Sequence, residues 1–125
     1  MEHIEGIKRM VDRQLALKEK EAAQKKKEVE SLFEERARVH LKIHGKVQGV
    51  FFRAFVESKA IELKLAGRVQ NKEDGVVEVV AEGEKSALEK LIEHCKKGPR
   101  SSVITDVEVK WETFRGEFGN FVVNS

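Results

Sequence analysis

Residues 45–53 read GKVQGVFFR, and this stretch joins two segments with different periodicities. Residues 39–43 just before it, VHLKI, alternate apolar and polar side chains, which predicts a half-buried strand. Residues 52–64 just after it carry apolar side chains near helical spacing, which predicts an amphipathic helix. Gly45 and Gly49 give the backbone of the junction the freedom to turn sharply. The stretch therefore predicts a strand, a loop and a helix in succession.

The segments that follow repeat the same two periodicities. They predict strands at 66–71 and 76–83, a helix at 84–96, a long strand at 102–114 and a short strand at 119–124. Asp74-Gly75 marks a turn between the first two strands, and Gly98-Pro99 ends the helix. The order strand, helix, strand, strand, helix, strand is that of a ferredoxin-like βαββαβ fold. We therefore predict an α+β domain over residues 37–125, with an antiparallel sheet and two helices on one face.

Residues 1–36 differ in character from the domain that follows. They contain no proline, one glycine (Gly6) and many good helix formers. Apolar residues recur there with a period of about eleven residues, which describes a nearly straight helical stripe. We therefore expect a long N-terminal α-helix preceding the domain. A lone amphipathic helix must bury its stripe, so residues 1–36 are predicted to project and to pair with another copy as a homo-oligomer.

Composition limits the partners and the compartment. The chain of 125 residues carries 24 Lys and Arg against 22 Asp and Glu, a net charge of +2. So balanced a charge predicts neither nucleic-acid nor membrane binding. No apolar run approaches the ~20 residues that cross a bilayer, and the N-terminus lacks the apolar core of a signal peptide. A single cysteine, Cys95, allows no internal disulfide, and we expect a cytoplasmic protein.

The loop at 45–53 has the features of a small phosphate site. Successive N–H groups in a glycine-containing loop can surround an anion, and the start of a helix attracts one. Arg53 lies in the first helical turn, where a cation is unfavourable unless a negative partner is bound. Glycine spacing alone favours an ordinary tight loop slightly over a phosphate-binding one. The spacing does not match a Walker A loop, so bound ATP is not expected.

Two motifs together resemble the acylphosphatase family. GKVQGVFFR is followed by GRVQNKEDGVVEV at residues 67–79, and both are similar to family patterns. The matching positions are Gly45, Val47, Gln48, Gly49, Val50, Phe52 and Arg53, then Gly67, Val69, Asn71, Asp74, Gly75, Val77 and Glu78. The resemblance covers residues 38–124. Two departures are Arg68, where the family usually has an aromatic residue, and the extension at 1–36.

This resemblance implies an activity and a set of site residues. It implies hydrolysis of a small-molecule acyl phosphate to a carboxylate and inorganic phosphate, without metal or cofactor. Arg53 would bind the phosphoryl oxygens, Asn71 would position the attacking water, and Gly45 would be a structural glycine. The loop amides would hold the phosphoryl group, from residues Lys46, Val47, Gln48, Gly49, Val50, Phe51 and Phe52. Such a site needs positioning and charge stabilisation more than covalent catalysis, because a carboxylate is already a good leaving group.

Other interpretations have less support. A catalytically silent scaffold acting through its N-terminal helix has no need of Arg53 or Asn71. An RNA-binding domain of the same strand order needs an aromatic third strand, and VVEVVA at 76–81 has no aromatic residue. His40 and His44 lie about 13 Å apart along one strand, too far to share a metal ion. Cys95 fits the apolar stripe of its helix and is predicted to be a buried, inert thiol.

Overall fold

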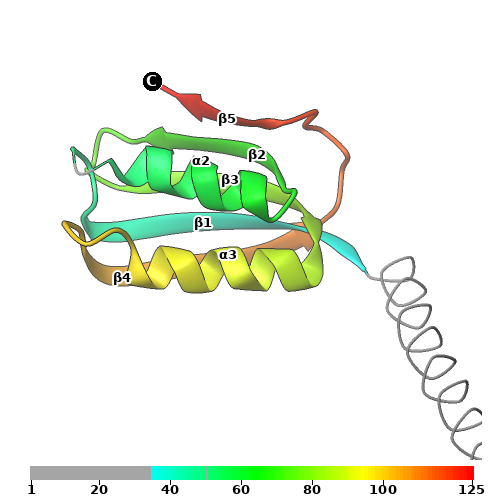
Figure 1. The fold of residues 1–125 in the computed structure, drawn as a ribbon, viewed down its shortest axis with the longest axis horizontal. Helices are drawn as coiled ribbons and strands as arrows, with labels where there is room; N and C mark the ends of the chain where they lie inside the picture. Colours follow the sequence, from blue (N-terminus) through cyan, green and yellow to red (C-terminus); the bar gives the residue numbers. More distant parts are fainter. Residues whose placement is uncertain (1–34, 50) are drawn as a thin grey trace, which may run out of the picture. The chain divides into compact units, whose positions relative to one another are not determined.

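A computed structural model describes residues 35–49 and 51–125 of the chain, and Figure 1 shows its arrangement. Five strands form one sheet in the order β4-β1-β3-β2-β5. Both helices lie over the same face of this sheet (Figure 1). The elements in chain order are β1 (Arg36–Lys46), α2 (Phe52–Glu62), β2 (Ala66–Asn71), β3 (Val77–Glu84), α3 (Lys85–Lys97), β4 (Val103–Thr113) and β5 (Phe121–Asn124). The predicted ferredoxin-like α+β fold is thereby confirmed.

The sheet is mixed, so the prediction of an antiparallel sheet was wrong. β1 pairs antiparallel with β3 and β4, and β2 pairs antiparallel with β3. However, β5 pairs parallel with β2, from Gly67 opposite Phe121 to Gln70 opposite Asn124. The reason is topological. After β4 the chain crosses to the far edge of the sheet and turns back, so β5 runs opposite to β4, which is the direction of β2.

The predicted N-terminal helix falls outside the described residues, which begin at residue 35. The prediction that residues 1–36 project and pair with another copy is therefore untested and stays a prediction. Arg36 is the first residue of β1. Among the described residues, no helix is long and apolar enough to cross a lipid bilayer.

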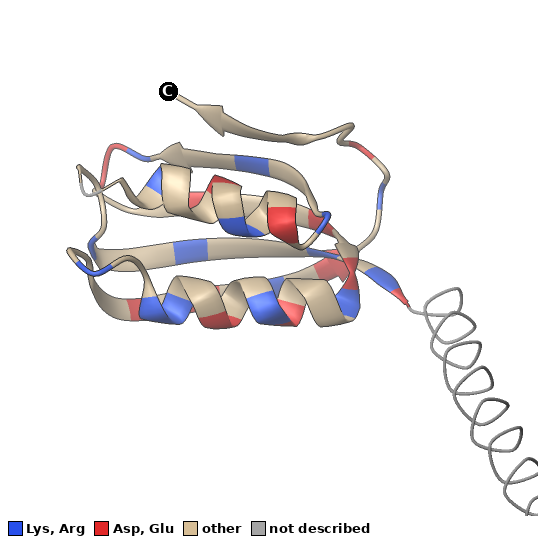
Figure 2. Cartoon of the chain, viewed as in Figure 1, with Lys and Arg blue, Asp and Glu red and all other residues tan. Residues whose placement is uncertain are grey.

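The core lies between the sheet and the two helices. Alternate residues of β1, namely Val39, Leu41 and Ile43, are completely buried on this side. They pack in one cluster with Phe52 of α2 and Leu88 of α3, among others. The close packing of these buried side chains fixes the position of α2, whose first turn begins at Phe52 within the GKVQGVFFR stretch. Charged residues of both signs are distributed over the two helices (Figure 2).

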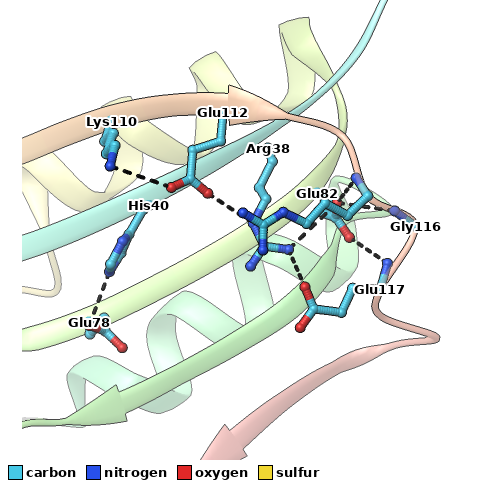
Figure 3. Close-up of polar contacts among 9 residues, drawn as sticks. Arg38, His40, Glu78, Glu82, Lys110, Glu112, Gly116 and Glu117 are labelled. Atoms are coloured by element: carbon cyan, nitrogen blue, oxygen red, sulfur yellow. Dashed lines mark hydrogen bonds and ion pairs between the residues drawn. The ribbon is translucent and has the colours of Figure 1, made fainter.

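The other face of the sheet contains a buried ionic cluster that the sequence did not predict. Arg38 of β1 and Glu82 of β3 are paired across the strands and are only 5% and 2% exposed. Arg38 Nη1 lies 2.7 Å from Glu117 and 3.7 Å from Glu82, and its Nε lies 3.1 Å from Glu112 (Figure 3). The cluster joins β1 and β3 to β4 and to the segment 114–120. Because a buried charge is costly without partners, the two residues depend on each other.

Glu82 has further partners in the backbone of the same segment. Its carboxylate accepts hydrogen bonds from the N–H groups of Arg115 (2.6 Å), Gly116 (3.2 Å) and Glu117 (3.0 Å) (Figure 3). Burial raises the pKa of Glu82, but these N–H groups and Arg38 together hold it below the ordinary 4.5. The carboxylate is therefore a charged anchor for the chain between β4 and β5.

Candidate active site

The loop between β1 and α2 has an unusual backbone. Gly45 has φ 127°, and a Cβ added there would lie 2.0 Å from the carbonyl oxygen of Val103 in β4. Only glycine fits that approach, so its predicted structural role agrees with the geometry. At the other end of the loop, Phe51 precedes α2 in the left-handed region (φ 61°) and is 87% exposed. Within the described residues no side chain caps α2, so the N–H groups of its first turn remain available to an anion.

A pocket of about 320 Å³ lies at this end of α2. Arg53 of α2 and Asn71 of β2 both line it, together with the loop residues Val47, Gly49, Phe51 and Phe52. Lys46 and Gln48 are not among the lining residues, and Val50 is outside the described residues. The fold thus brings the two polar residues of the separate motifs to one cavity.

Arg53 is anchored on the C-terminal strand. Its Nη1 donates a 2.8 Å hydrogen bond to the backbone carbonyl of Asn124 in β5. A guanidinium has five N–H donors, so this bond orients the group and leaves other donors for an anion. The short last strand therefore has a role in the site, which the sequence did not indicate.

Asn71 is the last residue of β2, and its side-chain oxygen is buried. Among the described residues that oxygen has no hydrogen-bond partner. A buried acceptor without a donor is uncommon and costs free energy unless water or a ligand supplies one. Asn71 also lines a second cavity of about 600 Å³ next to the turn between β2 and β3. Asn71 therefore lines both cavities and carries a buried acceptor that no donor of the described residues satisfies.

Gln48 connects the loop to the turn between β2 and β3. Its side-chain Nε2 donates to the carbonyl oxygens of Lys72 (2.8 Å) and Val76 (3.1 Å). Those two residues are themselves joined by a 2.8 Å bond from the N–H of Lys72 to the carbonyl of Val76. The side chain of Gln48 thus holds the two motifs in a fixed relation. Sequence reasoning predicted only its backbone amide as a ligand.

Comparison with known proteins identifies the family. The sequence model of the Acylphosphatase family matches residues 39–123. An acylphosphatase of Pyrobaculum arsenaticum is 48% identical over 88 residues, covering 70% of this chain and 93% of the relative. One of Pelotomaculum thermopropionicum is 41% identical over 88 residues, covering 70% and 96%. The crystal structure of acylphosphatase from Bacillus subtilis is similar at a TM-score of 0.69 and 37% identity, covering 71% and 99%.

The chain belongs to the acylphosphatase family. It is therefore an enzyme that hydrolyses acyl phosphates to a carboxylate and inorganic phosphate. The solved acylphosphatase is covered almost completely by this chain, and residues 1–38 lie outside the match of the family model. The scaffold interpretation is accordingly not favoured.

Arg68, the departure from the acylphosphatase pattern, packs on an aromatic ring from another segment. Its guanidinium carbon lies 5.8 Å from the centroid of the Phe118 ring, and that of Arg38 lies 5.3 Å from the same ring. Phe118 belongs to the segment between β4 and β5. Cation–π contacts of this kind are worth about 0.5–1 kcal/mol at exposed sites. Arg68 thus strengthens the attachment of that segment to the sheet.

The other residues considered from the sequence are placed apart from the pocket. His40 lies 3.0 Å from Glu78, and His44 lies 2.6 Å from Glu108, so each histidine has its own carboxylate partner. Cys95 is completely buried in α3, and burial raises the pKa of its thiol to about 12. A thiol in that state is a poor nucleophile, as predicted.

Proposed function

We propose that the 320 Å³ pocket at the start of α2 binds the phosphoryl group of a small acyl phosphate. The N–H groups of residues 46–52 and the guanidinium of Arg53 hold the phosphoryl oxygens, and Gly45 allows the loop to adopt its shape. Asn71 accepts a hydrogen bond from the attacking water. The observation that supports this most is that Arg53 and Asn71, from separate motifs, line one cavity, and that the side-chain oxygen of Asn71 has no partner among the described residues.

The reaction needs few groups. The water oxygen forms a bond to phosphorus while the bond from phosphorus to the acyl oxygen breaks, and the carboxylate leaves with the bonding electron pair. Arg53 and the loop amides stabilise the charge on the phosphoryl oxygens. Asn71 is neutral and a poor base, so the proton of the water passes to an oxygen of the substrate phosphate. No metal ion or cofactor takes part in this scheme.

The test is hydrolysis of benzoyl phosphate by the full chain with a chelator present. Substituting Arg53→Gln removes the fixed cation, and we expect kcat/KM to fall by at least about a hundredfold. Lys59→Gln is the matched control. It removes a cation from the same helix, but one that contacts Glu62 and the ring of Phe55. Equal activity of the Arg53→Gln variant and the wild-type protein would refute the assignment.

Three further predictions concern the whole chain. A cytoplasmic location and self-association through residues 1–36 follow from composition and periodicity, and they remain predictions. Separate domains at 1–36 and 37–125 likewise remain a proposal. It is supported by the family match, which begins at residue 39.

A further inference from the structure

The strand β4 forms one edge of the sheet. Among the described residues it is bonded to β1 on one side and to no strand on the other. It runs for 11 residues, Val103–Thr113, without a proline. Edge strands normally carry prolines, several lysines or bulges that prevent pairing with another chain. Here Lys110 is the only lysine, and the one register irregularity lies near the start of β4, between Asp106 and Ile104.

One face of β4 carries a row of apolar side chains, Val107, Val109 and Trp111. These residues pair with the buried residues of β1, so they lie on the side of the core. The helices do not cover the row completely, because Val109 remains 38% and Trp111 42% exposed. Trp111 also lines a surface cavity of about 420 Å³. The edge therefore combines open backbone groups with accessible apolar area.

The opposite face of β4 carries charged side chains, and two of opposite sign stand on either side of Val109 in the sequence. Glu108 and Lys110 flank Val109 and have opposite signs, while Val107 and Trp111 lie one step further out. We propose that β4 is a homodimer interface in which two copies pair antiparallel, with the two-fold axis through Val109. Each Glu108 then lies opposite a Lys110, and each Val107 lies opposite a Trp111. Directly opposed residues in such a pair interact most strongly.

Neighbouring registers are less favourable. A shift of one residue would place apolar side chains opposite charged ones on the wrong face. A shift by two residues moves the two-fold axis to Glu108 or to Lys110. The charged residue at the axis then lies opposite its own copy. In the proposed register Asp106 meets Glu112 at the ends, but Glu112 is already held by Arg38 at 3.1 Å.

This interface would leave both active sites accessible. The phosphate pocket is lined by residues of α2, β2 and β5, and β5 is the opposite edge of the sheet from β4. Pairing at β4 would extend one continuous sheet across both copies. The backbone hydrogen bonds supply affinity, and the alternating side chains supply specificity.

The first experiment is sedimentation velocity of the full chain, with charge exchanges at the interface. Glu108→Lys and Lys110→Glu each place like charges opposite one another, and we expect the particle mass to halve in each. The double exchange restores opposite signs, so the mass should return to that of the wild-type protein. If residues 1–36 join a different pair of copies, loss of the β4 contact still halves the mass. If they join the same pair, the cross-linking at residue 109 described below decides. Benzoyl phosphate hydrolysis by every variant checks that the fold survives, because Glu108 and Lys110 also pair with His44 and Glu112.

A monomeric wild-type protein would overturn the proposal, and so would unchanged mass in the single variants together with no cross-linking at residue 109. A mass that the charge exchanges do not change is also expected if residues 1–34, and not a second copy, cover β4. A double exchange that fails to restore the mass would overturn the register, since a pair centred on Glu108 is not repaired by it.

A second measurement uses cysteine cross-linking at the axis. In the proposed register Val109→Cys places two thiols directly opposite, within the Cα range of a disulfide, so mild oxidation should link the copies. Thr113→Cys is the control, because its two copies would be separated by about 26 Å. Equal cross-linking of both variants, or of neither, would count against the interface.

Discussion

At the scale of single residues, the end of α2 contains a conformation that its side chain disfavours. Lys64 has φ 57°, and its N–H donates to the carbonyl of Ile61, while that of Leu65 donates to Ala60. These bonds form a Schellman motif, in which glycine is the usual residue at the position of Lys64. The apolar Leu65 follows and is buried, as the motif commonly requires. The lysine is thus held in the left-handed region by the bonds around it.

Glycine at this position should therefore be more stabilising than alanine. We expect Lys64→Gly to raise the free energy of unfolding by about 0.5–1 kcal/mol relative to Lys64→Ala, because alanine loses the same charge but keeps the left-handed strain. Urea denaturation of the two variants measures the difference. If alanine equals or exceeds glycine, the strain at this position is not significant.

The residues of the candidate site differ in whether the sequence could predict their roles. Arg53 and Asn71 were predicted because the resemblance assigned them roles, and the structure brings both to one cavity. The side-chain bonds of Gln48 were not predicted, because they reach carbonyls 24 and 28 residues away and leave no local pattern. The anchor of Arg53 on Asn124 was missed for the same reason.

At the scale of elements, the position of the loop between β1 and α2 depends on the hairpin of β2 and β3. Gln48→Ala removes both bonds to the turn between these strands. We expect kcat/KM for benzoyl phosphate to fall by about tenfold to a hundredfold, because a loop displaced by about 1 Å no longer fits the phosphoryl group. Stability should fall by no more than about 1–2 kcal/mol, since both bonds lie near the surface.

Gln70→Ala provides the matched control for this coupling. Gln70 has an amide side chain on strand β2, and it does not line the pocket at the start of α2. Its loss should leave kcat/KM near that of the wild-type protein. If Gln48→Ala retains full activity, the loop holds its shape without the hairpin.

The elements themselves were largely predictable, and their pairing was less so. Alternation identifies β1 and β4, and helical spacing identifies α2 and α3, because each pattern reflects burial on one side. The parallel pairing of β5 was missed. A strand of 4 residues carries too little pattern to specify its neighbour, and the crossing segment 114–120 that sets its direction has no signal of its own.

At the scale of the whole molecule, the ionic cluster joins strands β1, β3 and β4 to the segment 114–120. Arg38 and Glu82 lie on the two central strands, and Glu82 binds the backbone of the segment that leads from one sheet edge to the other. Composition could not reveal this cluster, because its members lie up to 79 residues apart and look like ordinary surface charges. It stabilises the path of the chain towards β5, which in turn anchors Arg53.

The cluster makes stability depend on pH in a defined direction. The pKa of Glu82 is below its ordinary value of 4.5 in the folded protein, since its N–H partners and Arg38 outweigh the effect of burial. The pKa of Glu78 is also lowered, by His40 and Lys72 against burial. Folded carboxylates with lowered pKa bind protons less readily than unfolded ones. Their stabilisation is therefore complete above about pH 4.5 and is lost as pH falls through the folded values.

Glu82→Gln tests how much of this dependence belongs to the cluster. We expect the variant to be about 3 kcal/mol less stable at pH 7, because the amide cannot accept from all three N–H groups and leaves Arg38 with one anion fewer. It should also lose less stability than the wild-type protein between pH 6 and pH 3, since it has no proton to bind there. Urea denaturation across that range measures both effects, with Glu89→Gln on the exposed side of α3 as the control. A Glu82→Gln protein whose stability falls with pH as steeply as that of the Glu89→Gln protein would show that Glu82 is not the source.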